Sequence, residues 1–349
     1  MRAAVIVEPG RIAIEERPIP QPGPGEVLVR SAAVGICGTD VELFEGRHPP
    51  EYCRYPLVPG HEWAGTVVAL GPGVQHVAVG DHVAVEGFVA CGTCRNCRRG
   101  LTDLCERGYD ELGFTRPGGA AEYVVVPARQ LHRLPPEAAL DEAPLLEPSA
   151  VVVHSFLRAH PEPGDLVVVI GDGTIGLLAV QVARLYSPRA IVLVGRHPER
   201  LAAGRELGAT ETINARDGDP VMAFQQRTGE RGADFVFEGA GRADAVEQAF
   251  AFARRGGTVA LTGAAGAGAQ LTIPSDLFVF KHLTVVGTFG ASTVAWEQAV
   301  ALFSAGLLRL RPLISHRFPL ADYATALDTL RTRQPGVIKV LVEHDGVRA

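Results

Sequence analysis

The sequence lacks long apolar runs, since no stretch approaches the roughly 18 consecutive apolar residues that a membrane-spanning helix needs. The first ten residues also lack the apolar core of a secretory signal peptide, and they predict a short strand that ends at Pro9-Gly10. Aromatic residues are scarce, at 6%, but hydrophobic residues reach 47% and charged ones 21%, which excludes a largely disordered chain. We therefore expect a protein of the cytosol without a membrane partner.

The chain also lacks an excess of positive charge, because 33 basic residues against 39 acidic ones leave a formal net charge of −6. Such a chain has no overall electrostatic attraction for nucleic acids, so we expect no nucleic acid as partner. Its 40 glycines and 25 prolines predict many tight turns and at least one glycine-rich site. At 349 residues, the length predicts two domains.

Four of the six cysteines lie close together, in the pattern Cys91-x2-Cys94-x2-Cys97-x7-Cys105. Thiolates at this spacing converge on one ion, which predicts a closed structural zinc site with no open coordination position. Disulfides are the alternative in an oxidising compartment, and an iron–sulfur cluster is another. The nearby arginines 95, 98 and 99 are interpreted as a solvated face; contacts to phosphates in a nucleic-acid-binding ribbon are the other reading.

A second candidate metal site combines Cys37 with His61, since each lies in a glycine-flanked turn. Glu147 is a third candidate ligand, because a carboxylate between apolar residues and a proline is costly to bury unpaired. Three protein ligands with an open fourth position are typical of catalytic zinc. The alternatives are a small buried apolar cysteine and a carboxylate that stabilises a helix N-terminus. Cys53 has no partner pattern and is predicted to be inert.

The chain changes character near residue 150. Before it, short strands and turn residues alternate, as at residues 27–34, 64–70 and 82–85. After it, the apolar strand Asp165–Gly171 is followed by alternating helices and strands, which predicts a doubly wound α/β domain. We expect helices at 175–186, 198–207, 294–304 and 323–332, further strands at 190–194, 235–237, 257–261 and 283–287, and a last strand at 337–342 that returns to the first domain.

The glycine loop Gly171-Asp-Gly-Thr-Ile-Gly176 follows a buried strand and opens a helix, the context that indicates a dinucleotide site. Gly171 makes the tight turn, Gly173 lets the pyrophosphate approach the backbone, and Gly176 lets the helix pack on the strand. Thr174 and Ile175 complete the predicted cofactor-binding loop.

The next strand bears on the choice of cofactor. Where an NAD site has an acidic residue, this chain has Gly195, followed by Arg196. Loss of the carboxylate admits a 2′-phosphate, and Arg196 and Arg200 are positioned to bind it. The sequence therefore favours NADP(H), and a looser NAD(H) site with a surface arginine is the alternative.

Together these motifs resemble the zinc-dependent medium-chain dehydrogenase/reductase family. Gly60-His-Glu-Trp-Ala-Gly-Thr-Val-Val-Ala-Leu-Gly71 is similar to its zinc signature, and the cysteine lobe at 91–105 and the glycine loop occur in the same order. The resemblance implies a GroES-like β-barrel catalytic domain, residues 1–150 and 291–349, and a Rossmann domain with a doubly wound parallel sheet, residues 151–290. It also implies a homodimer or homotetramer, in which the edge strand near residues 283–288 pairs.

The resemblance also implies roles for single residues. Cys37, His61 and Glu147 match ligands of the catalytic zinc, and Glu62 matches a residue that exchanges with Glu147 on the metal. Asp40 would orient His61, Thr39 would relay the substrate proton, and Lys339 would reach the cofactor. No histidine matches the usual end of the proton relay, which leaves Glu42, His48 or bulk water.

Glu147-Pro148 resembles the sorbitol and threonine dehydrogenase branch, and Gly195-Arg196 resembles its NADP-dependent members. Three short segments, at 59–63, 111–115 and 320–327, are similar to 2-deoxy-scyllo-inosamine (cyclitol) dehydrogenases. The expected function is reversible hydride transfer between nicotinamide and a secondary alcohol of a polyol, sugar or cyclitol, with an alcohol or ketone as the small-molecule substrate. The alternatives are an L-threonine dehydrogenase-like enzyme and a non-catalytic zinc- and nucleotide-binding protein.

Overall fold

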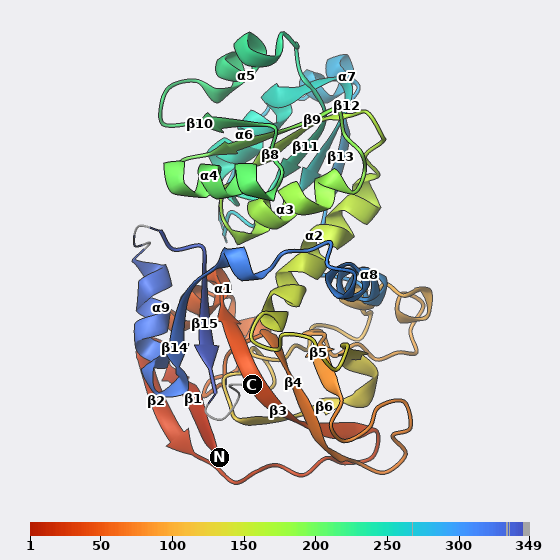
Figure 1. Ribbon diagram of the computed structural model, residues 1–349, viewed down its shortest axis with the longest axis vertical. Coiled ribbons are helices and arrows are strands. Elements are labelled where there is room, and N and C mark those ends of the chain that lie inside the picture. Colours follow the sequence, from red (N-terminus) through yellow and green to blue (C-terminus); the bar gives the residue numbers. More distant parts are fainter. Residues whose placement is uncertain (267, 333, 335, 345–349) are drawn as a thin grey trace. The chain divides into compact units, whose positions relative to one another are not determined.

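The computed structural model describes residues 1–344 except 267, 333 and 335. The chain forms two compact units, each with its own sheet (Figure 1). Unit 1 comprises Met1–Glu147, Ala291–Gly306 and Leu310–Ala349, and unit 2 comprises Pro148–Gly290 and Leu307–Arg309. The first crossing thus lies three residues before the expected end at residue 150, and unit 2 gains a short segment from beyond residue 290. Among the described residues, no helix is long and apolar enough to cross a membrane.

Unit 1 is built on a mostly antiparallel sheet in the order β14-β15-β3-β4-β5-β7, with β6 also paired to β3. The last strand, β15, pairs antiparallel with β3, so the C-terminal segment returns to the N-terminal unit as expected. The strands of this unit are β1 (Arg2–Glu8), β2 (Arg11–Glu16), β3 (Glu26–Ile36), β4 (Glu62–Leu70), β5 (His82–Val85), β6 (Tyr123–Pro127), β7 (Leu131–Arg133), β14 (Ile314–Pro319) and β15 (Lys339–Glu343).

The core of unit 1 is made mainly of alanine and valine from these strands, closed by Trp63 and Tyr323. Small and β-branched side chains suit this sheet because they pack closely on its pleated surface. Among its described residues, this unit contains the α-helices α1 (Gly38–Phe44), α8 (Thr293–Ser304) and α9 (Tyr323–Arg331). α1 directly follows β3, and this junction places Cys37 at its N-cap.

Unit 2 contains a six-stranded parallel sheet in the order β10-β9-β8-β11-β12-β13. Its strands are β8 (Leu166–Ile170), β9 (Ala190–Gly195), β10 (Glu211–Asn214), β11 (Ala233–Glu238), β12 (Ala253–Leu261) and β13 (Thr284–Gly287). Its helices are α2 (Leu146–Ala159), which carries the chain in from unit 1, α3 (Thr174–Arg184), α4 (Pro198–Leu207), α5 (Pro220–Thr228), α6 (Ala243–Phe252) and α7 (Asp276–Lys281). This is the predicted doubly wound α/β fold.

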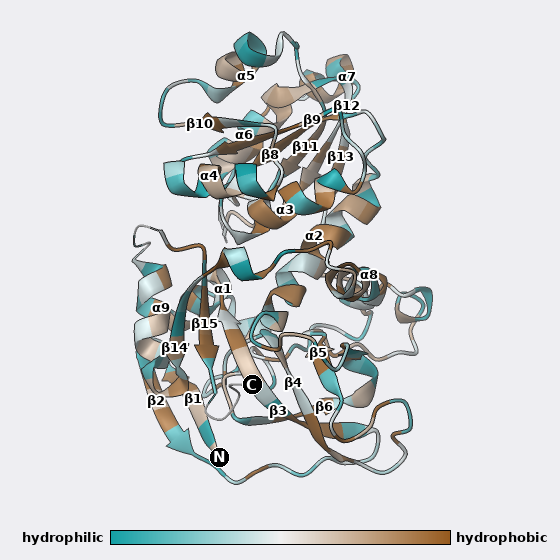
Figure 2. Ribbon diagram, in the orientation of Figure 1, coloured by the Kyte–Doolittle hydropathy of each residue, from teal (hydrophilic) through white to brown (hydrophobic). Residues whose placement is uncertain are grey.

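The strand order reverses direction between β8 and β11, and such a switch point is where nucleotides bind in doubly wound sheets. β8 is buried along its whole length, as expected for its unbroken apolar sequence. Figure 2 shows the hydrophobic residues of this sheet in brown. Some expected bounds need correction. α3 begins at Thr174 and ends at Arg184, because the chain turns at Ser187 with a φ of 54°. β12 begins four residues earlier than expected, at Ala253, where it pairs with Ala233.

Candidate active site and cofactor site

The four lobe cysteines come together in unit 1, with their ligand atoms within 4.8 Å of one another. The sulfur atoms of Cys91 and Cys97 are 3.9 Å apart, against about 3.8 Å for two thiolates on one tetrahedral zinc. Hydrogen bonds from Thr93 and from the backbone of Cys94 lower the pKa of Cys91 to about 5, while burial raises that of Cys97 to about 12. Four thiols in one cluster ionise together only around a cation, so the lobe fits a structural zinc ion.

Hydrogen bonds fix this lobe to the rest of unit 1. Thr102, between the third and fourth cysteines, accepts a 3.0 Å hydrogen bond from the backbone N–H of Thr293 at the start of α8. The Thr293 hydroxyl donates to Glu86, whose other carboxylate oxygen lies 2.8 Å from His132 Nε2. The His132 ring in turn stacks on Trp296 of α8. The lobe is therefore part of the scaffold of unit 1.

Cys37 and His61 come together at the ends of two neighbouring strands. Cys37 follows β3 and caps α1, and His61 directly precedes β4, which pairs with β3. The Cys37 Sγ lies 3.4 Å from His61 Nε2, close to the roughly 3.6 Å between a thiolate and an imidazole on one tetrahedral zinc. The thiolate raises the pKa of His61 against the effect of burial, and His61 Nδ1 has no hydrogen-bond partner among the described residues. The pair fits two ligands of one ion.

Glu62 completes the compact group with Cys37 and His61. Its carboxylate is held by Lys339 of β15, whose Nζ lies 2.7 Å from Glu62 Oε1 and donates also to the carbonyl of Ile36. The side chains of Glu62 and Lys339 are each only 3% exposed. Lys339, which was expected to reach the cofactor, is therefore paired in this structure with Glu62, the carboxylate expected to exchange with Glu147 on the metal.

Glu147 lies in the first turn of α2, near His61 and Glu62 but outside that compact group. Burial raises the pKa of Glu147 to about 8, and the positive charge of His61 opposes this effect. The carboxyl group interacts electrostatically with His61, Glu62 and Lys339. A cation placed among Cys37, His61 and Glu147 would hold this carboxyl group ionised.

The candidate relay residues lie on and after α1. The backbone N–H of Thr39 donates to Cys37 Sγ, which fixes Thr39 next to the thiolate. Asp40 accepts from the backbone N–H of Cys37; its other oxygen, Oδ1, has no hydrogen-bond partner among the described residues, so Asp40 does not orient His61 by a hydrogen bond. Glu42 and His48 lie 3.8 Å apart, and burial lowers the pKa of His48. Their separation exceeds hydrogen-bond distance, and neither ring nitrogen of His48 has a hydrogen-bond partner among the described residues.

The glycine loop in unit 2 has the predicted strand–loop–helix form, between β8 and α3. Gly171 has a φ of 116°, a left-handed conformation that favours glycine. A Cβ on Gly176 would lie 1.7 Å from the Gly171 carbonyl oxygen, so only glycine fits where the helix meets the strand. Gly173 caps α3 without a side-chain hydrogen bond and leaves the helix N-terminus open to an anion, with Thr174 and Ile175 in its first turn.

Beside the end of β9 lies a carboxylate whose role the sequence did not predict. Asp172, in the glycine loop, accepts hydrogen bonds of 2.7 Å from the backbone N–H groups of both Arg196 and His197. Its side chain is 8% exposed, and its carboxylate also lies 3.1 Å from His197 Nδ1 and 3.9 Å from Arg200. Gly195 thus ends β9 and Arg196 follows it, but a carboxylate from the loop after β8 stands beside them. The acidic residue inside the glycine loop was its only sequence signal.

Glu111 is a second residue that sequence reasoning passed over, except as part of a similar segment. It is 7% exposed and accepts a hydrogen bond from Tyr109. The Phe114 ring is a neighbour of both this pair and the candidate metal group, since it lies 5.0 Å from the His61 ring and 6.2 Å from that of Tyr109. Burial raises the pKa of Glu111 to about 7, opposed by the charge of His61.

Fold and site define a class: an oxidoreductase with two metal-fitting clusters in one unit and a dinucleotide loop in the other. Comparison with known proteins agrees. Residues 23–136 match the alcohol dehydrogenase GroES-like domain, and residues 174–305 match the zinc-binding dehydrogenase domain. The chain therefore belongs to the zinc-dependent medium-chain dehydrogenases, in the branch of the threonine and sorbitol dehydrogenases.

Individual relatives cover nearly the whole chain. An L-threonine 3-dehydrogenase of Deinococcus radiodurans is 34% identical over 99% of this chain and 98% of its own, and a sorbitol dehydrogenase of Bacillus subtilis is 31% identical over 98% and 97%. A zinc-binding dehydrogenase of Sinorhizobium meliloti bound to NADP superposes with a TM-score of 0.91 at 33% identity, covering 98% of each chain. An Escherichia coli alcohol dehydrogenase with NADH also reaches 0.91, at 30% identity, covering 98% and 99%.

Proposed function

We propose that this dehydrogenase oxidises a secondary alcohol of a polyol, sugar or cyclitol, reversibly, with a nicotinamide cofactor bound by unit 2. The observation that carries the proposal is the Cys37–His61 pair at a zinc-ligand distance, with two carboxylates beside it. Membership of the dehydrogenase family removes the alternative of a non-catalytic protein. Zinc, when bound, acts as a Lewis acid that lowers the pKa of the substrate hydroxyl.

The residues of the chain then have separate tasks. Cys37, His61 and Glu147 hold the metal, and Glu62 stays with Lys339 as a reserve carboxylate. Thr39, fixed beside the Cys37 sulfur, would accept the proton of the substrate hydroxyl while it gives its own hydroxyl proton onward, toward the Glu42–His48 pair and solvent. The glycine loop and the N-terminus of α3 would hold the pyrophosphate of a nicotinamide cofactor, whose chemistry, when it is bound, is to accept or give a hydride.

The test is absorbance of reduced nicotinamide, with zinc-replete protein, NAD⁺ or NADP⁺, and a panel of polyols, sugars and cyclitols. We expect turnover with at least one member of the panel. Absence of turnover with both cofactors, in both directions, would contradict the proposal.

A second candidate function, oxidation of an amino alcohol as in the threonine dehydrogenases, is favoured by Glu111. No described cationic side chain forms an ion pair with Glu111, and a buried carboxylate without a cation is costly. The rings of Tyr109 and Phe114 beside it add faces that attract an ammonium group. A substrate with an amino group close to the reacting hydroxyl would supply the missing positive charge.

Replacement of Glu111 by glutamine tests this second candidate. If it is correct, Glu111→Gln lowers kcat/KM for 2-aminocyclohexanol by about 10- to 100-fold, through loss of a charge-assisted hydrogen bond, and changes that for 1,2-cyclohexanediol far less. Asp110→Asn is the matched control, because Asp110 is the adjacent carboxylate and pairs with Arg116 at 2.8 Å. An equal loss on both substrates would assign Glu111 a purely structural role.

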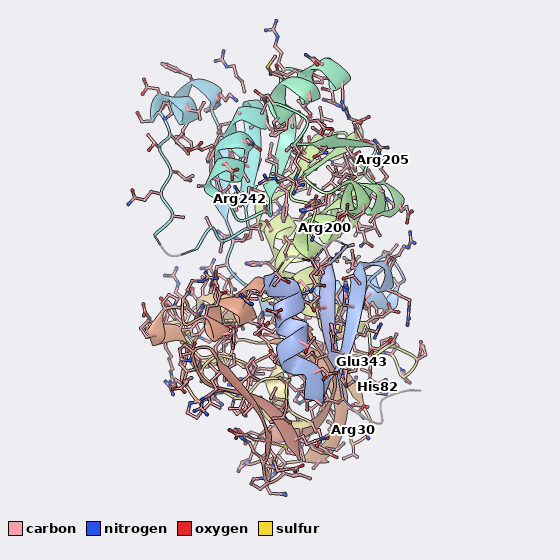
Figure 3. The ribbon with its side chains drawn as sticks, turned by 90° about the vertical axis from the view of Figure 1, so that its left-hand side faces the viewer. Arg30, His82, Arg200, Arg205, Arg242 and Glu343 are labelled. Atoms are coloured by element: carbon pink, nitrogen blue, oxygen red, sulfur yellow. The ribbon has the colours of Figure 1, made fainter. Side chains whose placement is uncertain are left out.

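For the cofactor, we propose that the chain favours NADP(H) and also accepts NAD(H). Arg196 is exposed and forms no ion pair with any described residue, and the buried Nε of Arg200 has no hydrogen-bond partner among them. Figure 3 labels Arg200 and Arg205, both on α4. A guanidinium without a partner at the end of β9 is suited to a 2′-phosphate. NADP- and NADH-bound structures both occur among the similar proteins.

We further propose a homodimer or homotetramer that pairs through β13. This strand is the edge of its sheet and is largely exposed, and Val279, Phe280 and Phe289 near it are 73%, 68% and 61% exposed. Exposed apolar edges of this kind are typical interfaces. We expect Val285→Lys to convert the oligomer to a smaller species in light scattering, whereas Met222→Lys, on exposed α5, leaves it intact. A wild-type monomer would contradict the proposal.

A further inference from the structure

The end of β9 is shaped by Asp172. A Cβ on residue 195 would lie 2.5 Å from the Cβ of Asp172 and 2.6 Å from its Oδ2, distances that side chains do not reach. Glycine at position 195 is therefore required by the carboxylate next to it, whatever ligand binds there. Although β9 itself ends without an acidic residue, Asp172 places a negative charge at this position.

The same carboxylate already uses the groups that bind anions at this position. Backbone N–H groups in the turn after the strand, together with neighbouring cationic side chains, are natural partners of a phosphate. Here Asp172 accepts from both N–H groups, of Arg196 and His197, and lies against the His197 ring and the Arg200 guanidinium. Among the described residues after β9, Arg196 is left as the cation without an ion pair.

We propose that Asp172 determines how strongly the chain discriminates between the two nicotinamide cofactors, by placing a fixed negative charge where the 2′-position of the adenosine ribose is recognised. The charge repels a 2′-phosphate and weakens the attraction of that phosphate to Arg196 and Arg200, so that NAD(H) remains a usable cofactor. The inference rests on the proposed dinucleotide site and extends it to a residue of the glycine loop, whereas the choice of cofactor is usually decided at the end of the following strand.

The geometry also fixes the direction of the expected change. Asp172→Asn removes the charge but keeps an oxygen that accepts from the two backbone N–H groups, so the loop is expected to hold its shape. Arg200 and His197 lose their anionic neighbour and become free to bind phosphate. The 2′-phosphate is a dianion, and the charge of Asp172 would repel it strongly at a separation of a few ångströms. Removal of this charge should therefore raise the ratio of NADP(H) affinity to NAD(H) affinity about tenfold or more.

The experiment measures dissociation constants for NADPH and NADH by fluorescence titration, together with kcat/KM for NADP⁺ and NAD⁺, in wild type and Asp172→Asn. Asp217→Asn is the matched control, since Asp217 is an exposed carboxylate of the same unit that accepts from Asn214. We expect tighter NADPH binding, NADH binding within about threefold, and no change of ratio in the control. The titration does not depend on turnover.

Equal weakening of both cofactors would show that Asp172 only supports the loop, and a fall in the ratio would show that it organises a phosphate pocket; either result overturns the inference. Arg196→Gln separates this outcome from failure of the proposed cofactor preference. If Arg196→Gln does not weaken NADPH binding, the NADP(H) proposal fails, whereas the response to Asp172→Asn still decides the role of the carboxylate.

Discussion

Replacement of Cys37 by serine is expected to lower hydride transfer by more than about 100-fold while the chain remains folded. Even partners of metal ligands cost 10- to 100-fold when removed, and Cys37 is proposed as a ligand itself. Cys37 is at a helix N-cap, a position where serine is favoured, and it is partly exposed. The substitution should therefore change the free energy of unfolding little. Zinc content should fall from two ions to one per chain, because the four-cysteine lobe is a separate cluster.

The control for this prediction is Cys53→Ala. Cys53 is buried with Ile6, Leu43, Leu57 and Phe114 and belongs to neither candidate metal group; its thiol donates to the Pro49 carbonyl at 3.7 Å and also interacts with the Tyr55 hydroxyl. This variant should keep two zinc ions and its activity, with a modest loss of stability from the small cavity. Retention of both zinc ions and of activity by Cys37→Ser would refute the assignment of the catalytic site.

Most of what the sequence could predict depends on residues that lie close together along the chain. The four lobe cysteines lie within one short segment, and the glycine loop lies between one strand and the next helix, so neither needs knowledge of distant contacts. Cys37 and His61 were paired as candidate ligands from their glycine-flanked turns, and the resemblance to a family then implied that both bind the catalytic zinc. Their approach in space follows from pairing of β3 with β4, where Gly35 lies opposite Glu62.

Contacts between distant segments account for what the sequence did not predict. Lys339 meets Glu62 across 277 positions of sequence, because β15 returns to pair with β3. Asp172 reaches residues 196 and 197 because β8 and β9 are neighbours whose carboxyl ends meet at one edge. In both cases the motif placed one partner correctly, and only the register of the sheet revealed the other. A carboxylate therefore lies beside Gly195, although the strand that contains Gly195 supplies none.

The second large effect is expected for Lys339→Met. The substitution leaves Glu62 as a buried carboxylate without its cation, and breaking a buried ion pair in this way costs about 3–5 kcal/mol of unfolding free energy. Attraction by Glu62 raises the pKa of Lys339 against the effect of burial. Its contribution to stability is therefore complete at neutral pH and is lost only as the pH rises above the ordinary lysine value of 10.5, through the raised one.

Tryptophan fluorescence during urea unfolding measures this loss in the right unit, because both tryptophans, Trp63 and Trp296, belong to unit 1. Lys281→Met is the control, since Lys281 donates to backbone carbonyls within unit 2 and should leave this transition within about 0.5 kcal/mol. The double variant Glu62→Gln/Lys339→Met removes both charges and should be less destabilised than the sum of its single variants. Additive losses would mean that the two side chains are not coupled and that Glu62 is already free to bind the metal.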